Sequence, residues 1–232
     1  MRILLVNDDG IKSPGIWALY DELSKDNDVT ICAPSEQRSG YSHSISLGQY
    51  MTVHRYKRGN ARAYAVDGTP ADCTMVGLDA FADKPFDLVI SGINNGYNAA
   101  MDVHYSGTIG AAAEARMQGV RALAVSTDMG NKDFAATLKF TRTAINMTMS
   151  DTSSDRFISL NVPAGNPEKL IKAELGALDR HVYFALESEQ DDLITLKSTN
   201  GYSGYTSGCD SDLLMHGQAV YSVLSIDWTH KT

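Results

Sequence analysis

The chain has 232 residues, of which 43% are hydrophobic, and its formal net charge at neutral pH is −8. This length suits one large α/β domain, and the hydrophobic content is sufficient for a buried core. The acidic balance excludes a broad surface for a nucleic-acid duplex, since the nearest basic cluster is the short stretch 54–59.

Cysteine usage and hydropathy indicate the compartment. Cys32, Cys73 and Cys209 lie far apart and form no Cys-x-x-Cys pair, which predicts reduced thiols. The apolar stretch at the start is too short for a signal peptide, and no run approaches membrane-spanning length. We therefore expect a cytoplasmic protein without a membrane partner.

Strand-like and helix-like patterns alternate over the first 165 residues. The apolar run 2–6 predicts a strand, and 13–26 predicts a helix because its apolar residues recur at three- and four-residue spacing. Further along the chain, strands are predicted at 28–34, 86–92, 121–127 and 156–165, and helices at 69–82 (with Thr69 as N-cap and Pro70 first), 108–119 and 134–149. A helical crossover implies parallel strands, so we expect a Rossmann-like, doubly wound, mainly parallel sheet.

The end of the chain has a different pattern. β-type segments at 181–188, 193–212 and 219–228 surround a Gly/Ser/Tyr-rich loop at 199–211. There is no internal repeat and no clear linker. We expect one α/β domain over 1–232 in which residues from about 180 to 232 form a β-rich C-terminal extension.

Polar residues follow three of the predicted strands. Asp8 and Asp9 follow the first strand, the segment 35–44 with Ser39 follows the second, and the Asn-rich segment 91–98 follows the third. Ligands of a parallel sheet bind beyond the carboxyl ends of its strands. We therefore expect these residues to meet on one rim.

The chemistry of this rim is rich in oxygen. Two neighbouring carboxylates repel each other, and a divalent cation removes that repulsion. Hard oxygen ligands favour Mg²⁺ or Mn²⁺ over a structural zinc. Adjacent side chains of a strand point to opposite faces, so Asp8 and Asp9 can serve one site only if the chain turns, which Gly10 permits. Taken singly, Asp8 and Asp9 could form a plain turn or a helix cap, and Ser39 could be an ordinary loop residue.

A phosphate-binding element is predicted at Ser106, Gly107 and Thr108, which lead into a helix. The N-terminus of a helix has free N–H groups and a partial positive charge, which suit an anion. The alternative is that Ser106 or Thr108 only caps the helix. There is no Walker motif, and no Gly-x-Gly-x-x-Gly follows the first strand, which disfavours a dinucleotide oxidoreductase.

Five segments together resemble the SurE family of stationary-phase survival proteins, which are metal-dependent 5′-nucleotidases. They are ILLVNDDGIKSPGI, APSEQRSGYSHSIS, VDGTPADC, DLVISGINNGYN and YSGTIGAAAEA, and they lie in this order within residues 1–165. The resemblance implies a Rossmann-like domain with a C-terminal extension used in oligomer contacts, as a homodimer or homotetramer. The C-terminal region here looks shorter than is common in the family, with a less clear hairpin.

The resemblance also implies roles for individual residues. It places one divalent metal ion per subunit on Asp8, Asp9, Ser39 and Asn94, with Asp8 and Asp9 as catalytic groups. It places phosphate or substrate contacts at Asn98, Ser106, Gly107 and Thr108. His43 lies in a matching segment and is a further candidate for phosphate or substrate contact; the alternative is a hydrogen-bonded structural histidine.

The predicted function is hydrolysis of nucleoside 5′-monophosphates to nucleoside and phosphate. The resemblance extends the expected substrates to 3′-nucleotides and short polyphosphate. The alternative is a non-catalytic nucleotide-binding module with a Rossmann-like fold, which would have no need for paired carboxylates.

Overall fold

Five parallel strands form the centre of the molecule. Each is an almost continuous apolar run that is buried on both faces, as is typical of a parallel sheet covered by helices. The computed structural model describes residues 1–227, with the backbone alone for 178–181 and 200–205. The central strands are β1 (Arg2–Val6), β2 (Asp28–Pro34), β5 (Leu88–Asn95), β6 (Arg121–Thr127) and β7 (Arg156–Val162).

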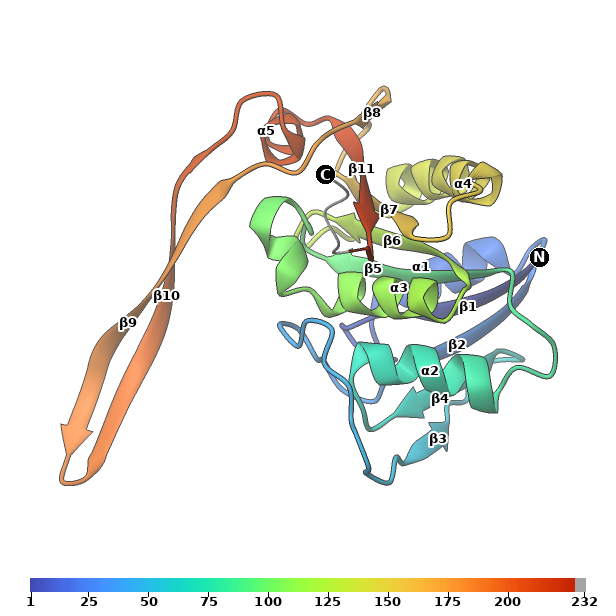
Figure 1. Cartoon of the computed structure of the whole chain (residues 1–232), viewed down its shortest axis with the longest axis horizontal. Coiled ribbons are helices and arrows are strands. Elements are labelled where there is room, and N and C mark those ends of the chain that lie inside the picture. The colour runs from blue at the N-terminus through green and yellow to red at the C-terminus, as the bar shows by residue number, and fades with distance from the viewer. Residues whose placement is uncertain (228–232) are drawn as a thin grey trace.

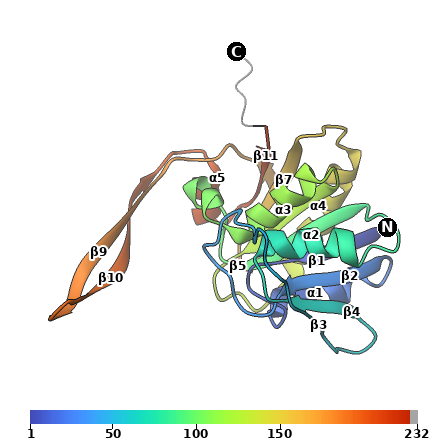
Figure 2. The same cartoon turned by 60° about the horizontal axis from the view of Figure 1, so that its bottom comes forward.

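Helices cover both faces of this sheet (Figures 1 and 2). Alternate residues of β1 divide between two cores: Ile3 and Leu5 pack with one pair of helices, and Leu4 and Val6 with the other. The first core contains α1 (Pro14–Leu23) and α4 (Ala135–Ser150), and the second contains α2 (Pro70–Ala80) and α3 (Gly107–Met117). This two-sided burial confirms the predicted doubly wound architecture.

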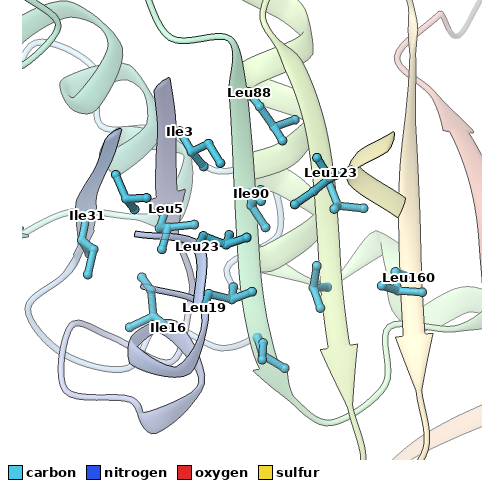
Figure 3. Close-up of a cluster of buried hydrophobic side chains, with 14 of the residues drawn as sticks. Ile3, Leu5, Ile16, Leu19, Leu23, Ile31, Leu88, Ile90, Leu123 and Leu160 are labelled. Atoms are coloured by element: carbon cyan, nitrogen blue, oxygen red, sulfur yellow. The ribbon is translucent and has the colours of Figure 1, made fainter. Parts of the chain in front are cut away.

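Figure 3 shows how tightly α1 packs on the strands. Its residues Ile16, Leu19 and Leu23 point toward Leu5 of β1 and Ile90 of β5. The helix begins as its residue types predict, because the Ser13 side chain accepts a hydrogen bond from the Gly15 N–H and proline follows. Helix α2 has a capping box between Thr69 and Asp72, which confirms the predicted cap.

Short strands extend the sheet at both edges, giving the order β3-β4-β2-β1-β5-β6-β7-β11-β8. The sequence patterns did not predict β3, β4, β8 or the short helix η1. A strand of three residues is too short for a periodic pattern. The bounds are β3 (Val53–Arg55), β4 (Arg62–Val66), β8 (Leu170–Lys172), β11 (Ala219–Ser225) and η1 (Ala100–His104).

The C-terminal region differs from its prediction. Strands β9 (Leu178–Gln190) and β10 (Leu193–Tyr205) form a long antiparallel hairpin that projects from the body (Figures 1 and 2). The predicted loop at 199–211 is therefore wrong in its first part, and so is the expectation of a short, unclear hairpin. After α5 (Asp210–Met215), β11 returns to the main sheet beside β7. Of the predicted segment 219–228, the last residue, Trp228, lies outside the described residues.

None of the helices within residues 1–227 combines the length and the apolar character needed to cross a bilayer.

We predict that Gly15→Ala destabilises the fold. A Cβ added at Gly15 would lie 2.3 Å from the backbone carbonyl oxygen of Ile93, so α1 would have to move away from β5. The expected loss in the free energy of unfolding is more than about 2 kcal/mol, measured by urea denaturation. Ser24→Ala, at the exposed end of the same helix, is the control and should change stability by less than about 0.5 kcal/mol. Equal stabilities of the two variants would refute the close approach of α1 to β5.

Candidate functional site

A tight turn at the end of β1 carries the two adjacent carboxylates. The Asn7 side chain closes this turn: its amide nitrogen donates to the Gly10 carbonyl at 3.0 Å, and its oxygen accepts from the Gly10 N–H at 3.1 Å. Gly10 has a φ of +89°, a conformation that favours glycine. The predicted turn at Gly10 is thus confirmed, and it takes Asp8 and Asp9 out of the strand geometry that would separate them.

Asp8 is buried against the first turn of α3. Its side chain is 3% exposed, and both of its oxygens accept hydrogen bonds from Thr108, one from the hydroxyl at 2.7 Å and one from the N–H at 3.1 Å. Gly107 makes this approach possible, since a Cβ there would lie 2.9 Å from the Asp8 Cβ. Burial raises the pKa of Asp8 to about 6, although the Thr108 hydrogen bonds act in the opposite direction.

Asp9 is partly buried next to β5. Its carboxylate accepts a hydrogen bond from the Asn95 N–H at 2.9 Å, and burial raises the pKa of Asp9 as well. Among the residues that the structure describes, no basic side chain forms an ion pair with Asp8 or Asp9. Two adjacent acidic groups without a protein counter-charge are poorly stabilised when ionised, so the pair fits a bound cation.

Ser39 and Asn94 stand on the neighbouring segments of the same rim. The Arg38 N–H donates to the Asp8 carbonyl at 2.7 Å, which ties the loop after β2 to the Asp turn and places Ser39 beside it. Asn94 follows an irregularity in β5, and its amide nitrogen donates to the Gly96 carbonyl at 2.8 Å. That bond uses the amide nitrogen, so the Asn94 side-chain oxygen is the atom that could bind a cation.

The donor set on this rim consists of two carboxylates, one hydroxyl and one amide oxygen. In the described part of the chain, no three His, Cys, Asp or Glu side chains cluster together. A cation bound at Asp8 and Asp9 would therefore need the neutral oxygens of Ser39 and Asn94, as well as water or substrate. All of these are hard ligands of the kind that Mg²⁺ and Mn²⁺ prefer.

The proposed phosphate element at the start of α3 has two structural roles in this conformation. The Ser106 hydroxyl accepts from the Ile109 N–H at 3.1 Å, so the helix-cap alternative is confirmed for this residue. Thr108 directs both its hydroxyl and its N–H to Asp8. Within residues 1–227, no hydrogen bond from the Gly107 N–H to another residue is found. Phosphate contact by this segment remains a prediction.

Asn98 lies deeper than the rim residues and belongs to a buried amide network. Its N–H donates to the Asn161 side chain at 2.8 Å, and its own amide nitrogen donates to the Ser126 hydroxyl at 2.9 Å. Sequence reasoning did not single out Ser126 or Asn161, although each is a polar residue within an apolar strand. In this conformation, Asn98 joins the ends of β6 and β7, and its contact with phosphate remains a prediction.

His43 fastens the Ser39 loop to α3. Its Nε2 atom lies 2.8 Å from a carboxylate oxygen of Glu114, whose other oxygen accepts from Gln118 at 2.8 Å. The Ser42 hydroxyl donates to the His104 carbonyl at 2.6 Å, just before α3 begins. His43 therefore has the hydrogen-bonded structural role that was its alternative, and a direct contact with substrate remains a prediction.

Comparisons with known proteins point to one family. A family model described as "Survival protein SurE" matches residues 3–184. A protein of Clostridium beijerinckii named 5′-nucleotidase SurE is 38% identical over 243 residues, covering 99% of this chain and 94% of the relative. Another of that name, from Syntrophus aciditrophicus, is 45% identical over 167 residues, covering 71% of this chain and 63% of the relative. The crystal structure of the Sure protein from Aquifex aeolicus superposes with a TM-score of 0.81 at 28% identity, covering 99% and 95% of the two chains.

We predict that Asp8→Asn stabilises the metal-free protein at neutral pH. The pKa of Asp8 is about 6 in the folded protein and 3.8 in an ordinary setting, so its ionisation opposes folding. This cost is absent below about pH 4, grows between about pH 4 and 6, and is complete above that range. An asparagine can still accept from the Thr108 N–H and donate to its hydroxyl.

Urea denaturation in EDTA should therefore show a gain of about 2–3 kcal/mol for Asp8→Asn at about pH 7.5, and almost none near pH 4. The control is Asp79→Asn, at an exposed position in α2, which should show no such pH-dependent gain. A variant less stable than the natural chain at neutral pH would contradict the buried, unpaired state of Asp8.

Proposed function

The chain belongs to the SurE family, and we propose that it is a divalent-metal-dependent phosphatase that hydrolyses nucleoside 5′-monophosphates to nucleoside and phosphate. The observation that carries this proposal is the buried Asp8–Asp9 pair, which has no basic partner in the described structure and faces a rim of neutral oxygens. Relatives that carry the name 5′-nucleotidase support the same reaction. A non-catalytic nucleotide-binding module would not need this pair. Activity on 3′-nucleotides and short polyphosphate rests on the family resemblance alone.

Asp8, Asp9, Ser39 and Asn94 would hold one Mg²⁺, Mn²⁺ or similar ion per subunit. When bound, such an ion supplies charge neutralisation and Lewis-acid activation of water near neutral pH. The protein contributes a fixed geometry, because Asn7, Thr108 and Asn95 hold the backbone turn and the two carboxylates in place. Fixed ligands require no reorganisation during the reaction.

The hydrogen bonds indicate different roles for the carboxylates of Asp8 and Asp9. Both oxygens of Asp8 already accept from Thr108, and the side chain is almost inaccessible, which favours a positioning role over nucleophilic attack. Asp9 is more accessible and borders a cavity, so it is better placed to take a proton from the attacking water. The structure therefore favours direct attack by water over a covalent phosphate on Asp8.

The start of α3 would bind the phosphoryl group. The N–H groups of Thr108 and Ile109 are already engaged, so the Gly107 N–H is the first-turn donor that can reach a phosphate oxygen. Ser106, Thr108 and Asn98 would assist by rearranging their present hydrogen bonds. The Glu114–His43 contact would keep the Ser39 loop and α3 at a constant separation.

The protein is further proposed to form a homodimer or homotetramer through the β9–β10 hairpin. This hairpin stands away from the body and carries several large apolar side chains in the open, including Phe184 at 66% and Leu193 at 68% exposure. Exposed apolar surface of this extent is typical of an interaction site. A cytoplasmic location is supported by the three cysteines, which are all free and buried.

The proposed mechanism is tested by removing the metal and by replacing Asp9. EDTA should abolish the release of phosphate from AMP, and Mn²⁺ or Mg²⁺ should restore it. Asp9→Asn should lower kcat at least ~100-fold without any loss of stability, because it removes both a ligand charge and the proposed base. Asp79→Asn, at an exposed site, is the control and should retain full activity. Undiminished activity in thoroughly metal-stripped protein would refute the mechanism.

The proposed assembly is tested by changing the apolar surface of the β9–β10 hairpin. Leu186 and Leu196 are cross-strand partners in the hairpin and are both exposed. The double variant Leu186→Glu/Leu196→Lys keeps a favourable pair across the strands but removes the apolar surface. It should sediment as a smaller species than the natural chain at micromolar concentration, whereas Met215→Glu, exposed outside the hairpin, should not. A natural chain that sediments as a monomer would contradict the proposal.

A further inference from the structure

A cavity of about 310 Å³ opens beside Asp9. Its walls come from the start of α1, the end of β5 and the loop that follows β6, all on the α1 side of the sheet edge. The start of α3, where phosphate is proposed to bind, packs on the other face of the sheet. The volume lies at the lower end of the range for small-molecule sites, which begins at about 300 Å³. None of the metal or phosphate chemistry described above uses the loop after β6.

Hydrogen bonds join this loop firmly to the Asp8–Asp9 site. Asn95 donates its N–H to Asp9 at 2.9 Å, and its side-chain oxygen accepts from the Gly130 N–H at 2.6 Å. The next residue of the loop, Asn131, donates to the Thr127 hydroxyl at 2.8 Å. The cavity is therefore preformed and continuous with Asp9, so a ligand there would sit next to the proposed reaction centre.

The lining combines an aromatic ring with polar groups. Phe134 and Ile93 supply apolar surface, whereas Gln37 and Asn95 supply amides. Lys132 adds an exposed ammonium group, and in the described part of the chain it forms no ion pair. An apolar ring suits a flat base, and nearby donors suit sugar hydroxyls and base acceptors.

A larger cavity has a different character. It has a volume of about 780 Å³ and runs along α3. Its lining is mostly aliphatic, with residues such as Ile109, Met117 and Leu224. Ser106 and His43 line it, whereas neither Asp8 nor Asp9 does. A leaving alcohol must remain next to the reaction centre, so the cavity beside Asp9 is the better candidate for the organic part of a substrate.

We propose that the cavity beside Asp9 binds the nucleoside part of the substrate, with the base against Phe134 and Lys132 donating to the sugar or the base. The inference rests on the proposed phosphatase function. It makes Lys132 and Phe134 residues that determine substrate specificity, whereas the metal and phosphate groups would act on any phosphomonoester.

The test compares AMP with β-glycerophosphate, whose short alcohol cannot fill the cavity. Lys132→Gln and Phe134→Leu should each raise the KM for AMP about tenfold, and leave kcat/KM for β-glycerophosphate within about twofold. The matched control is Met117→Ala in the groove along α3, which should change neither substrate's kinetics. Parallel losses on both esters, unchanged AMP kinetics in both cavity variants, or a selective loss in the Met117 variant would overturn the proposal.

A binding measurement separates this inference from the catalytic one. Saturation-transfer NMR with free adenosine should show binding to the natural chain and to Met117→Ala, and weaker binding to both cavity variants. A natural chain that hydrolyses neither ester would refute the proposed phosphatase function. The adenosine experiment would still show whether the cavity binds a nucleoside. Adenosine binding that is equal in all four proteins would overturn the assignment of the nucleoside.

Discussion

The contact of Asp8 with Thr108 is the interaction on which the candidate site depends. It holds a nearly inaccessible carboxylate against the first turn of α3 and links the end of β1 to the element proposed to bind phosphate. Burial raises the pKa of both Asp8 and Asp9, so the ionised pair is unfavourable in the protein alone. A cation bound at the proposed site would neutralise this unfavourable charge, and its binding would then be coupled to the stability of the turn.

Close backbone approach makes this arrangement possible. Side chains at Gly15, Gly107 and Gly110 would collide with Ile93, Asp8 and Ser42, respectively. At these glycines α1 and α3 approach the segments that carry Asn94, the Asp pair and Ser39. The helices therefore set the spacing of the rim, and the central strands, buried on both faces, keep the helices in register. This is a rigid support of the kind that a preorganised site needs.

Much of the fold could be predicted because its signals are local. The strands at 2–6, 28–34 and 121–127 match their predicted ranges, since an apolar run bounded by turn residues is a strong pattern. The hairpin could not be predicted in the same way. Residues 199–205 are rich in glycine, serine and tyrosine, which is typical of a loop, and only their pairing with β9 makes them a strand. Topology predicted that the polar segments after β1, β2 and β5 meet on one rim, and the family resemblance singled out Asp8, Asp9, Ser39 and Asn94 within them. The Thr108–Asp8 and His43–Glu114 contacts depend on packing distances that no periodic pattern contains.

We propose a single binding site for a divalent cation, formed by Asp8, Asp9, Ser39 and Asn94. Anomalous diffraction from crystals grown with Mn²⁺ tests it most directly, because manganese can be located independently of the protein. We expect one peak per subunit, within coordination distance of both carboxylates, the Ser39 hydroxyl and the Asn94 side-chain oxygen. No peak at this rim in crystals saturated with Mn²⁺, or a peak bound only elsewhere on the chain, would contradict it.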